Sequence, residues 1–124
     1  MKSNPVGWFE IPVTDMDRAK AFYEKAFEIQ IQVVDLGGTL TGWFPNVGDV
    51  IGATGSLIKQ ESYIPSHEGT LVYFSSADVQ IELNRIETAG GKILQGKTQI
   101  SPEHGYMAVF EDSEGNRVAL HSRQ

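Results

Sequence analysis

The sequence predicts an α+β fold made from two copies of a strand–helix–three-strand unit. A run rich in β-branched and aromatic residues leads into an amphipathic helix twice. The aspartates at the two junctions, Asp15 and Asp78, lie 63 residues apart (78 − 15). The same offset relates Ala26 to Ala89, where each helical pattern ends. Each half holds one helix among several strands, which favours α+β over a doubly wound parallel sheet.

The first half of the chain predicts one helix and four strands. Residues 6–13 form the first expected strand. The helix that follows places apolar residues at helical spacing along one face as far as Phe27. Asp15 is the expected N-cap, and Thr14 with Asp17 three residues later is an alternative capping box. Three further strands are expected, separated by turns rich in Gly and Asn: residues 29–36, 39–45 and 50–58.

The second half repeats this order after a polar linker. The expected linker is residues 59–68, between module one (5–58) and module two (69–122). A strand over 70–76 leads to the capping Asp78 and to a helix that ends at Gly90-Gly91, a typical C-terminal stop. Three strands are then expected: residues 92–100, 105–111 and 117–121.

Composition limits the classes of protein that this chain can represent. A length of 124 residues and a hydrophobic content of 40% predict one domain, residues 1–124, with a core of its own. The absence of cysteine excludes disulfides, thiolate metal sites and cysteine nucleophiles, and fits a cytoplasmic protein. The N-terminal residues lack the apolar stretch of a secretory signal, and no run of 18 apolar residues predicts a membrane span. A net charge of −6 argues against nucleic acid as a partner.

Three segments carry a resemblance to a known family. They are WFEIPVTDMDRAKAFYEKAF at residues 8–27, TLVYFSSADVQIELNRIETAGGKIL at 70–94 and GYMAVFEDSEGNRVALHS at 105–122. Together they resemble the vicinal oxygen chelate superfamily, the group of glyoxalase I, bleomycin-resistance proteins and extradiol dioxygenases. The closing GNRVALHS is most similar to small glyoxalase-like proteins of bacteria.

The resemblance implies two tandem βαβββ modules that form a cup-shaped half-barrel sheet. It also implies a homodimer, because small members of the superfamily often complete or cover the cup across a two-fold axis. Whether the modules pair within one chain or swap between two chains is left open.

The resemblance further implies a divalent metal held by one side chain from the first strand and one from the last strand of each module. The matching positions in this sequence are Trp8, Leu71, Ala119 and, by the repeat offset, Ser56. Divalent metals of this kind require carboxylate or imidazole ligands, which none of the four offers. We therefore expect no metal and no other cofactor, which argues against glyoxalase I and dioxygenase chemistry.

Because strand side chains alternate between two faces, the residues two positions further along share the face of the lost ligands. These residues are Glu10, Tyr73 and His121. A Glu–His pair in a partly dry cup is a plausible acid/base couple, with Tyr73 as a hydrogen-bond donor. Two alternatives remain: the pair satisfies itself or the backbone without doing chemistry, or it holds a relocated metal.

Aromatic residues suggest how a ligand is held. Trp8 is expected to form the floor of the cup and to stack on a planar molecule, with Trp43 nearby. Tyr106 is a candidate rim residue, and His104 is a loop histidine that is either catalytic or solvated. Ordinary packing or surface exposure is the alternative for each aromatic residue.

The function expected from the sequence is binding of a small organic molecule in the cup, without the usual metal. The expected ligand-binding residues are Trp8, Ser56, Leu71, Tyr106, Ala119 and Trp43. The alternative is a lyase or isomerase that uses Glu10 and His121 for proton transfer, with or without a divalent metal. A third possibility is an interaction subunit whose cup is a relic. We expect no nucleic acid and no membrane as partners.

Overall fold

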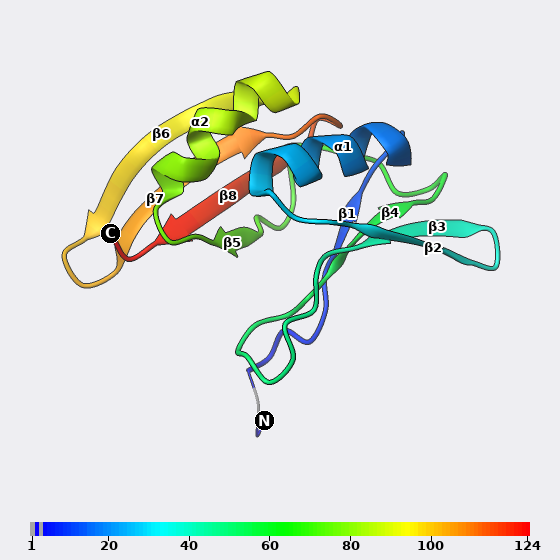
Figure 1. Ribbon diagram of the computed structural model, residues 1–124, viewed down its shortest axis with the longest axis horizontal. Helices are drawn as coiled ribbons and strands as arrows, with labels where there is room; N and C mark the ends of the chain where they lie inside the picture. Colours follow the sequence, from blue (N-terminus) through cyan, green and yellow to red (C-terminus); the bar gives the residue numbers. More distant parts are fainter. Residues whose placement is uncertain (1, 3) are drawn as a thin grey trace.

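The computed structural model describes residue 2 and residues 4–124 and contains two open, four-stranded mixed sheets, each with one helix on one face (Figure 1). The first sheet has the order β1-β4-β3-β2 and the second β5-β8-β7-β6. The predicted α+β fold of two βαβββ modules is confirmed. The elements of the first module are β1 (Glu10–Pro12), α1 (Met16–Phe27), β2 (Gln32–Leu36), β3 (Thr39–Trp43) and β4 (Ser56–Lys59). Those of the second are β5 (Tyr73–Ser75), α2 (Val79–Ala89), β6 (Lys92–Ser101), β7 (Gly105–Glu111) and β8 (Arg117–Ser122).

The repeat in the sequence is also a repeat of strand register. β1 pairs with β4 in parallel, with Glu10 opposite Ser56. β5 pairs with β8 in parallel, with Tyr73 opposite Ala119. Both members of the second pair follow their counterparts by 63 residues (73 − 10 and 119 − 56). Ser56 and Ala119 are therefore equivalent positions, as the sequence offset predicts.

The helix ends follow the capping predictions. The Asp15 carboxylate accepts a hydrogen bond from the backbone N–H of Arg18 at 3.0 Å, so Asp15 is the N-cap of α1. The alternative capping box is wrong, because the hydroxyl of Thr14 donates to Glu114 instead. Gly90 ends α2 with φ = 109°, a left-handed conformation that glycine adopts without strain.

Several strands are shorter than predicted, most clearly around residues 44–55. The expected strands 6–13, 39–45 and 50–58 contract to β1, β3 and β4. Pro45 has no N–H to donate to a ladder, and Gly52 and Gly55 have φ values of 124° and 70°, which are incompatible with a strand. Residues 4–9 and 44–55 instead form a protrusion below the body of the molecule, called the arm from here on (Figure 1).

One hydrophobic core joins the two modules. The buried faces of α1 and α2 contribute to the same cluster, together with residues from both sheets. Tyr23 is fully buried, and its ring lies 5.5 Å from that of Phe44 and 6.3 Å from that of Phe74, which come from different modules. At the helix–helix contact, Nζ of Lys25 donates to the carbonyl of Thr88 at 2.9 Å. The modules therefore pack against each other within this chain.

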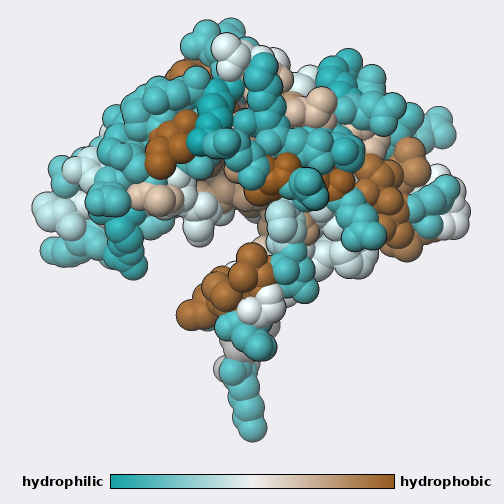
Figure 2. Space-filling model, viewed as in Figure 1, coloured by the Kyte–Doolittle hydropathy of each residue, from teal (hydrophilic) through white to brown (hydrophobic). Residues whose placement is uncertain are grey.

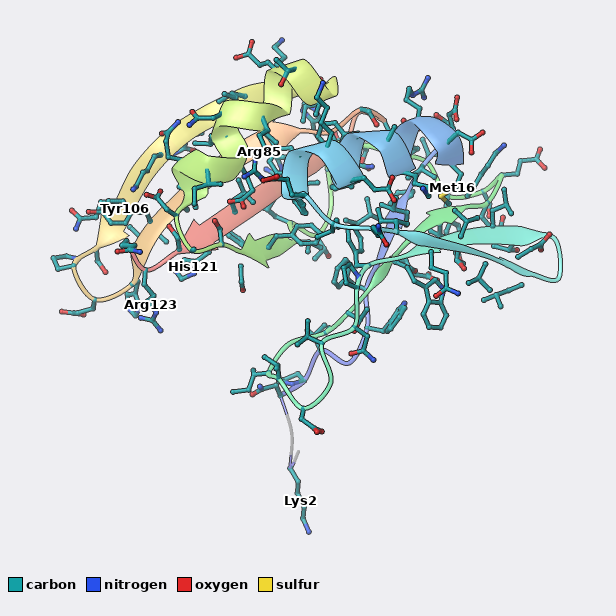
Figure 3. All side chains as sticks on the ribbon, viewed as in Figure 1. Lys2, Met16, Arg85, Tyr106, His121 and Arg123 are labelled. Carbon is teal, nitrogen blue, oxygen red and sulfur yellow. The ribbon has the colours of Figure 1, made fainter. Side chains whose placement is uncertain are left out.

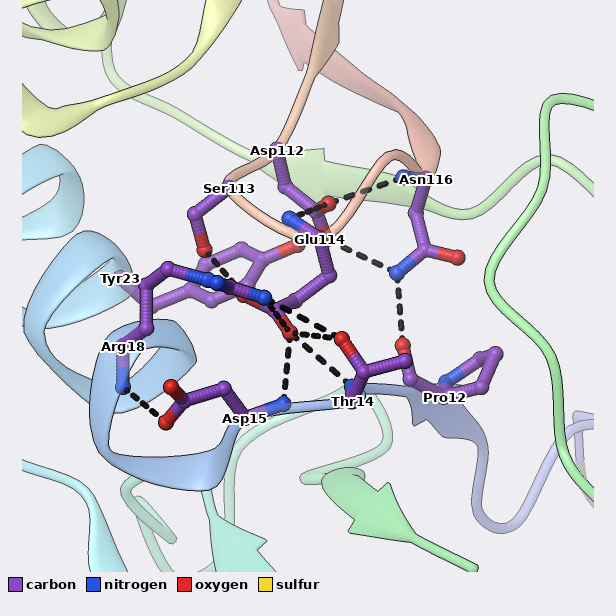
Figure 4. A network of polar contacts seen from close by, with 9 residues as sticks. All are labelled: Pro12, Thr14, Asp15, Arg18, Tyr23, Asp112, Ser113, Glu114 and Asn116. Carbon is purple, nitrogen blue, oxygen red and sulfur yellow. Dashed lines mark hydrogen bonds and ion pairs between the residues drawn. The ribbon is translucent and has the colours of Figure 1, made fainter. Parts of the chain in front are cut away.

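The turn between β7 and β8, residues 112–116, fastens the second module to the first (Figure 4). The Glu114 carboxylate accepts hydrogen bonds from the backbone N–H groups of Thr14 and Asp15, at 2.9 and 2.8 Å, and from Nε of Arg18 at 2.7 Å. The Asp112 carboxylate accepts one from the hydroxyl of Tyr23 at 2.7 Å. These bonds satisfy amides at the start of α1 that the helix itself leaves unpaired.

The fold carries no helix of membrane-spanning length and hydropathy among the described residues.

Candidate functional site

A cavity of about 850 Å³, the aromatic cavity, lies between the arm and residues 70–75 of the second module. Its volume falls in the range of small-molecule sites, which is roughly 300–1,000 Å³. Both segments of the arm, residues 4–9 and 44–55, contribute to its lining. The second module contributes β5 and the residues just before it. The large aromatic and aliphatic residues of its lining are Val6, Trp8, Phe9, Phe27, Ile29, Phe44, Val47, Val50, Ile51, Leu71, Val72, Tyr73 and Phe74.

Much of this apolar lining is exposed to solvent. Ile51 is 89% exposed, Val50 63% and Trp8 42%. Figure 2 shows the corresponding hydrophobic cluster on the arm, set off from the largely hydrophilic body. Contiguous exposed apolar surface is a common feature of binding sites.

Trp8 and Trp43 contact each other but have different surroundings. Their ring centroids are 5.1 Å apart, with an angle of 65° between the ring planes. The indole N–H of Trp43 donates to the hydroxyl of Thr41 at 2.9 Å, and that hydroxyl donates to the carbonyl of Val34. Trp43 is thereby held in place on β3, whereas Trp8 lines the aromatic cavity with Leu71 and Tyr73.

The strand registers place the other candidate residues in rows. Glu10, Ser56 and Trp43 form one row across β1, β4 and β3 of the first sheet. Tyr73 and Ala119 form the equivalent row on the second sheet, and His121 lies two rows further along, opposite Ser75. Ser56 and Ala119 are buried, whereas Glu10 is exposed.

Glu10 and His121 are not brought together as an acid/base couple. They lie on different sheets, and no hydrogen bond joins them in the described part of the chain. Nε2 of His121 lies 2.7 Å from the backbone carbonyl oxygen of His104. A carbonyl only accepts, so Nε2 carries the proton and is unavailable as a base or a metal ligand. His121 lies at the far end of β8 near Arg123, away from the arm (Figure 3).

Tyr106 lies on the opposite face of the second sheet. It is paired with the buried Ser122 of β8 and packs against the core. Nζ of Lys97 lies 4.7 Å from the centre of its ring, a cation–π contact. Tyr106 therefore does not join the other candidate residues at the rim of the aromatic cavity.

The donor set at the expected metal positions does not fit a divalent metal. Trp8 and Leu71 line the apolar cavity, and Ser56 and Ala119 are almost completely enclosed. Across residue 2 and residues 4–124, no three His, Asp or Glu side chains gather closely enough to hold a metal ion.

A second cavity, of about 390 Å³, lies between β1 of the first sheet and the start of β8 of the second; it is called the inter-sheet cavity here. Glu10 lines it, as does Arg117, a residue that the sequence analysis did not select. Arg117 lies two positions before Ala119 on the same strand, so the alternation that selected His121 also places Arg117 on that face. A third cavity, of about 670 Å³, lies between the β2–β3 hairpin and residues 59–65.

Comparisons with known proteins match this geometry. The family model described as Glyoxalase/Bleomycin resistance protein/Dioxygenase superfamily matches residues 6–120. A curated glyoxylase-like domain-containing protein of Didymella fabae is 30% identical over 122 residues, which is 95% of this chain and 93% of that protein.

Solved structures share the fold at lower identity. A glyoxalase I mutant from Zea mays superimposes with a TM-score of 0.72 at 20% identity; the match covers 96% of this chain but 47% of that chain, so this protein spans about half of its length. TnmS3, an antibiotic binding protein from a Streptomyces species, has a TM-score of 0.68 at 24% identity, with 100% and 99% coverage. The hypothetical protein SA1046 from S. aureus has a TM-score of 0.69 at 20% identity, with 96% and 94% coverage.

Proposed function

Since the chain belongs to the Glyoxalase/Bleomycin resistance protein/Dioxygenase superfamily, we propose that it binds a small, partly apolar organic molecule in the aromatic cavity. The observation that carries this proposal is the exposed aromatic lining shared by the arm and the second module. A superfamily fold supports many functions, so the argument depends on the site and not on the fold. The likeness to the antibiotic binding protein TnmS3, which has nearly the same length, supports it.

A planar ring is the chemical group that this cavity suits best. Trp8 of the arm and Tyr73 of β5 both present aromatic surface to it, and the ring of Trp43 packs against that of Trp8. Stacking between aromatic rings contributes about 0.5–1.5 kcal/mol beyond the burial of apolar area. Proton transfer by Glu10 and His121, the alternative function, has no comparable support, because His121 does not line the cavity that Glu10 lines and is hydrogen-bonded to the carbonyl of His104.

The test is binding of planar aromatic probes, beginning with the neutral 2-naphthamide, measured by calorimetry and thermal unfolding. A probe at a hundred times its dissociation constant is expected to raise the free energy of unfolding by about 2.7 kcal/mol. Trp8→Ala is expected to weaken binding by about tenfold, since it removes the stacking surface and its apolar area. Tyr63→Ala is the matched control, because Tyr63 is an aromatic residue of similar exposure that does not line this cavity. Equal losses in both variants, or no stabilisation by any aromatic probe, would contradict the proposal.

The expected homodimer stays a prediction. The exposed arm supports it, since a second copy is the other partner that covers apolar surface of this kind. Sedimentation equilibrium of the native chain and of Ile51→Asp tests it. A dimer that dissociates in the variant supports the prediction, and a monomer in both contradicts it.

A further inference from the structure

Arg117 carries a buried N–H group with no acceptor. Its Nε is enclosed and forms no hydrogen bond, the one such side-chain atom among the residues that the structure describes. None of the ion pairs among those residues includes its guanidinium. A buried donor without a partner is unfavourable, and a charged donor is more so. A ligand that supplies an acceptor for this N–H would therefore gain binding energy.

Three carboxylates lie near Arg117, and none of them is bound to it. Glu111 is its cross-strand neighbour, but the Glu111 carboxylate lies 2.7 Å from Nε2 of His67 and is used there. Glu10 and Glu68 line the same cavity, are exposed to water, and form no ion pair in the described chain. Solvent screens these two exposed charges more than it screens the enclosed part of Arg117.

We propose that Arg117 binds the carboxylate of an organic acid that enters the inter-sheet cavity. The guanidinium donates from Nε and a terminal nitrogen in parallel, the geometry that a carboxylate fits with both oxygens. The side chain turns its Nε edge toward the cavity when the acid enters, a rotamer change of the kind that binding sites commonly show. The bound acid gives the orphaned N–H the acceptor that the protein itself does not supply.

The inter-sheet cavity and the aromatic cavity adjoin each other. Phe9, Thr70 and Val72 line both of them. The proposal places one molecule across both cavities, with its acid group at Arg117 and its apolar ring in the aromatic cavity. The ligand class is an aromatic or apolar carboxylic acid, and in this respect the inference rests on the proposed function.

The experiment compares two probes of the same shape, 2-naphthoate and the neutral 2-naphthamide, by calorimetry on the full chain. We expect the acid to bind at least about tenfold more tightly than the amide, which corresponds to one charge-assisted hydrogen bond. Arg117→Gln is expected to abolish this preference, and Arg117→Lys to keep only part of it, because lysine lacks the paired donors. Arg123→Gln is the matched control, since it removes the same charge from an exposed position after β8. The Nε–H resonance of Arg117, followed by NMR, is expected to shift with the acid and not with the amide.

The variant Glu10→Gln provides an independent test, through the direction of the change in affinity for the acid. It removes a negative charge from the same cavity, so the acid is expected to bind a few-fold more tightly while binding of the amide is unchanged. Weaker binding of the acid in this variant would count against the assignment.

The outcomes separate this inference from the proposed function. Equal affinity for acid and amide, or a preference that survives in Arg117→Gln, overturns the inference, while binding of the amide that depends on Trp8 leaves the proposed function standing. A preference that depends on Arg117 but not on Trp8 supports the acid site and removes the aromatic cavity from the proposal. No binding of either probe at about millimolar concentration overturns both.

Discussion

Glu114 is expected to be the most costly surface-turn residue to replace. Its carboxylate side chain has no exposed area, although it lies in a turn, and it serves the start of α1 from the other module. Burial alone raises the pKa of Glu114, but hydrogen bonds from Arg18 and from the backbone of Asp15 and Thr14 outweigh burial and lower that pKa from 4.5 to about 2. The folded state therefore favours the ionised form of Glu114 much more strongly than the unfolded state does.

The magnitude follows from linkage between ionisation and folding. At 1.36 kcal/mol per pKa unit, a decrease from 4.5 to about 2 corresponds to about 3 kcal/mol of stability. Arg18 is 53% exposed, and solvent screening of its charge reduces the figure to about 2–3 kcal/mol. Because the folded pKa lies below the unfolded one, this stability is present above pH 4.5 and is lost as the pH falls toward 2.

Urea unfolding of the native chain and of Glu114→Gln, followed by circular dichroism at pH 7 and at several pH values below 4.5, tests this reasoning. The variant is expected to lose about 2–3 kcal/mol at pH 7 and to show a shallower decline in acid. Glu28→Gln is the control: Glu28 pairs with Arg85 but is 69% exposed, so its loss is expected to be about 0.5 kcal/mol. Equal costs in the two variants, or identical acid profiles of Glu114→Gln and the native chain, would refute the argument.

Two further predictions concern buried packing. Burial, followed by the nearby Asp112 charge, raises the pKa of Tyr23 well above 10, so stability is expected to fall as the pH rises past 10 and the unfolded chain ionises. Tyr23→Phe is expected to abolish that alkaline decline and to cost about 1–3 kcal/mol at pH 7, measured by urea unfolding, because Asp112 loses a donor. Gly55→Ala places a Cβ 2.2 Å from the ring of Phe9 at φ = +70°, and is expected to cost about 2–4 kcal/mol. Gly48→Ala meets nothing within 4 Å and is expected to leave the melting temperature almost unchanged; a similar loss in both would contradict the packing argument.

The repeat made most of the fold predictable. Local signals such as the caps Asp15 and Asp78 and the stop at Gly90 depend on a few neighbouring residues, so they can be found without tertiary information. The arm was not predicted, because the β-branched residues Val50 and Ile51 favour a strand. The positive φ values of Gly52 and Gly55 prevent a strand there. At Gly55 the ring of Phe9 also fills the space that a Cβ would need, which only the folded structure shows.

The sequence predicts which face of a strand each candidate residue occupies, but not which residues of the two sheets come together. The register places Tyr73 opposite Ala119, but alternation along one strand does not say which residues of the two sheets line one cavity, so it could not exclude His121 from the cavity that Glu10 lines. Arg117 was within reach of the same rule. The lack of an acceptor for its Nε–H could not be predicted, because it depends on the groups that surround the side chain in the folded protein.

The turn at residues 112–116 and its counterpart one repeat earlier have different structural roles. Counting back by 63 residues from Asp112 and Gly115 gives Asp49 and Gly52, so the stretch that fastens one half of the molecule corresponds to the tip of the arm in the other half. One copy is held by hydrogen bonds to the start of α1, whereas Val50 and Ile51 near the other are exposed. Under the proposed function, substitutions at Val50 and Ile51 near this tip change the lining of the aromatic cavity without touching the hydrogen bonds that join the two halves.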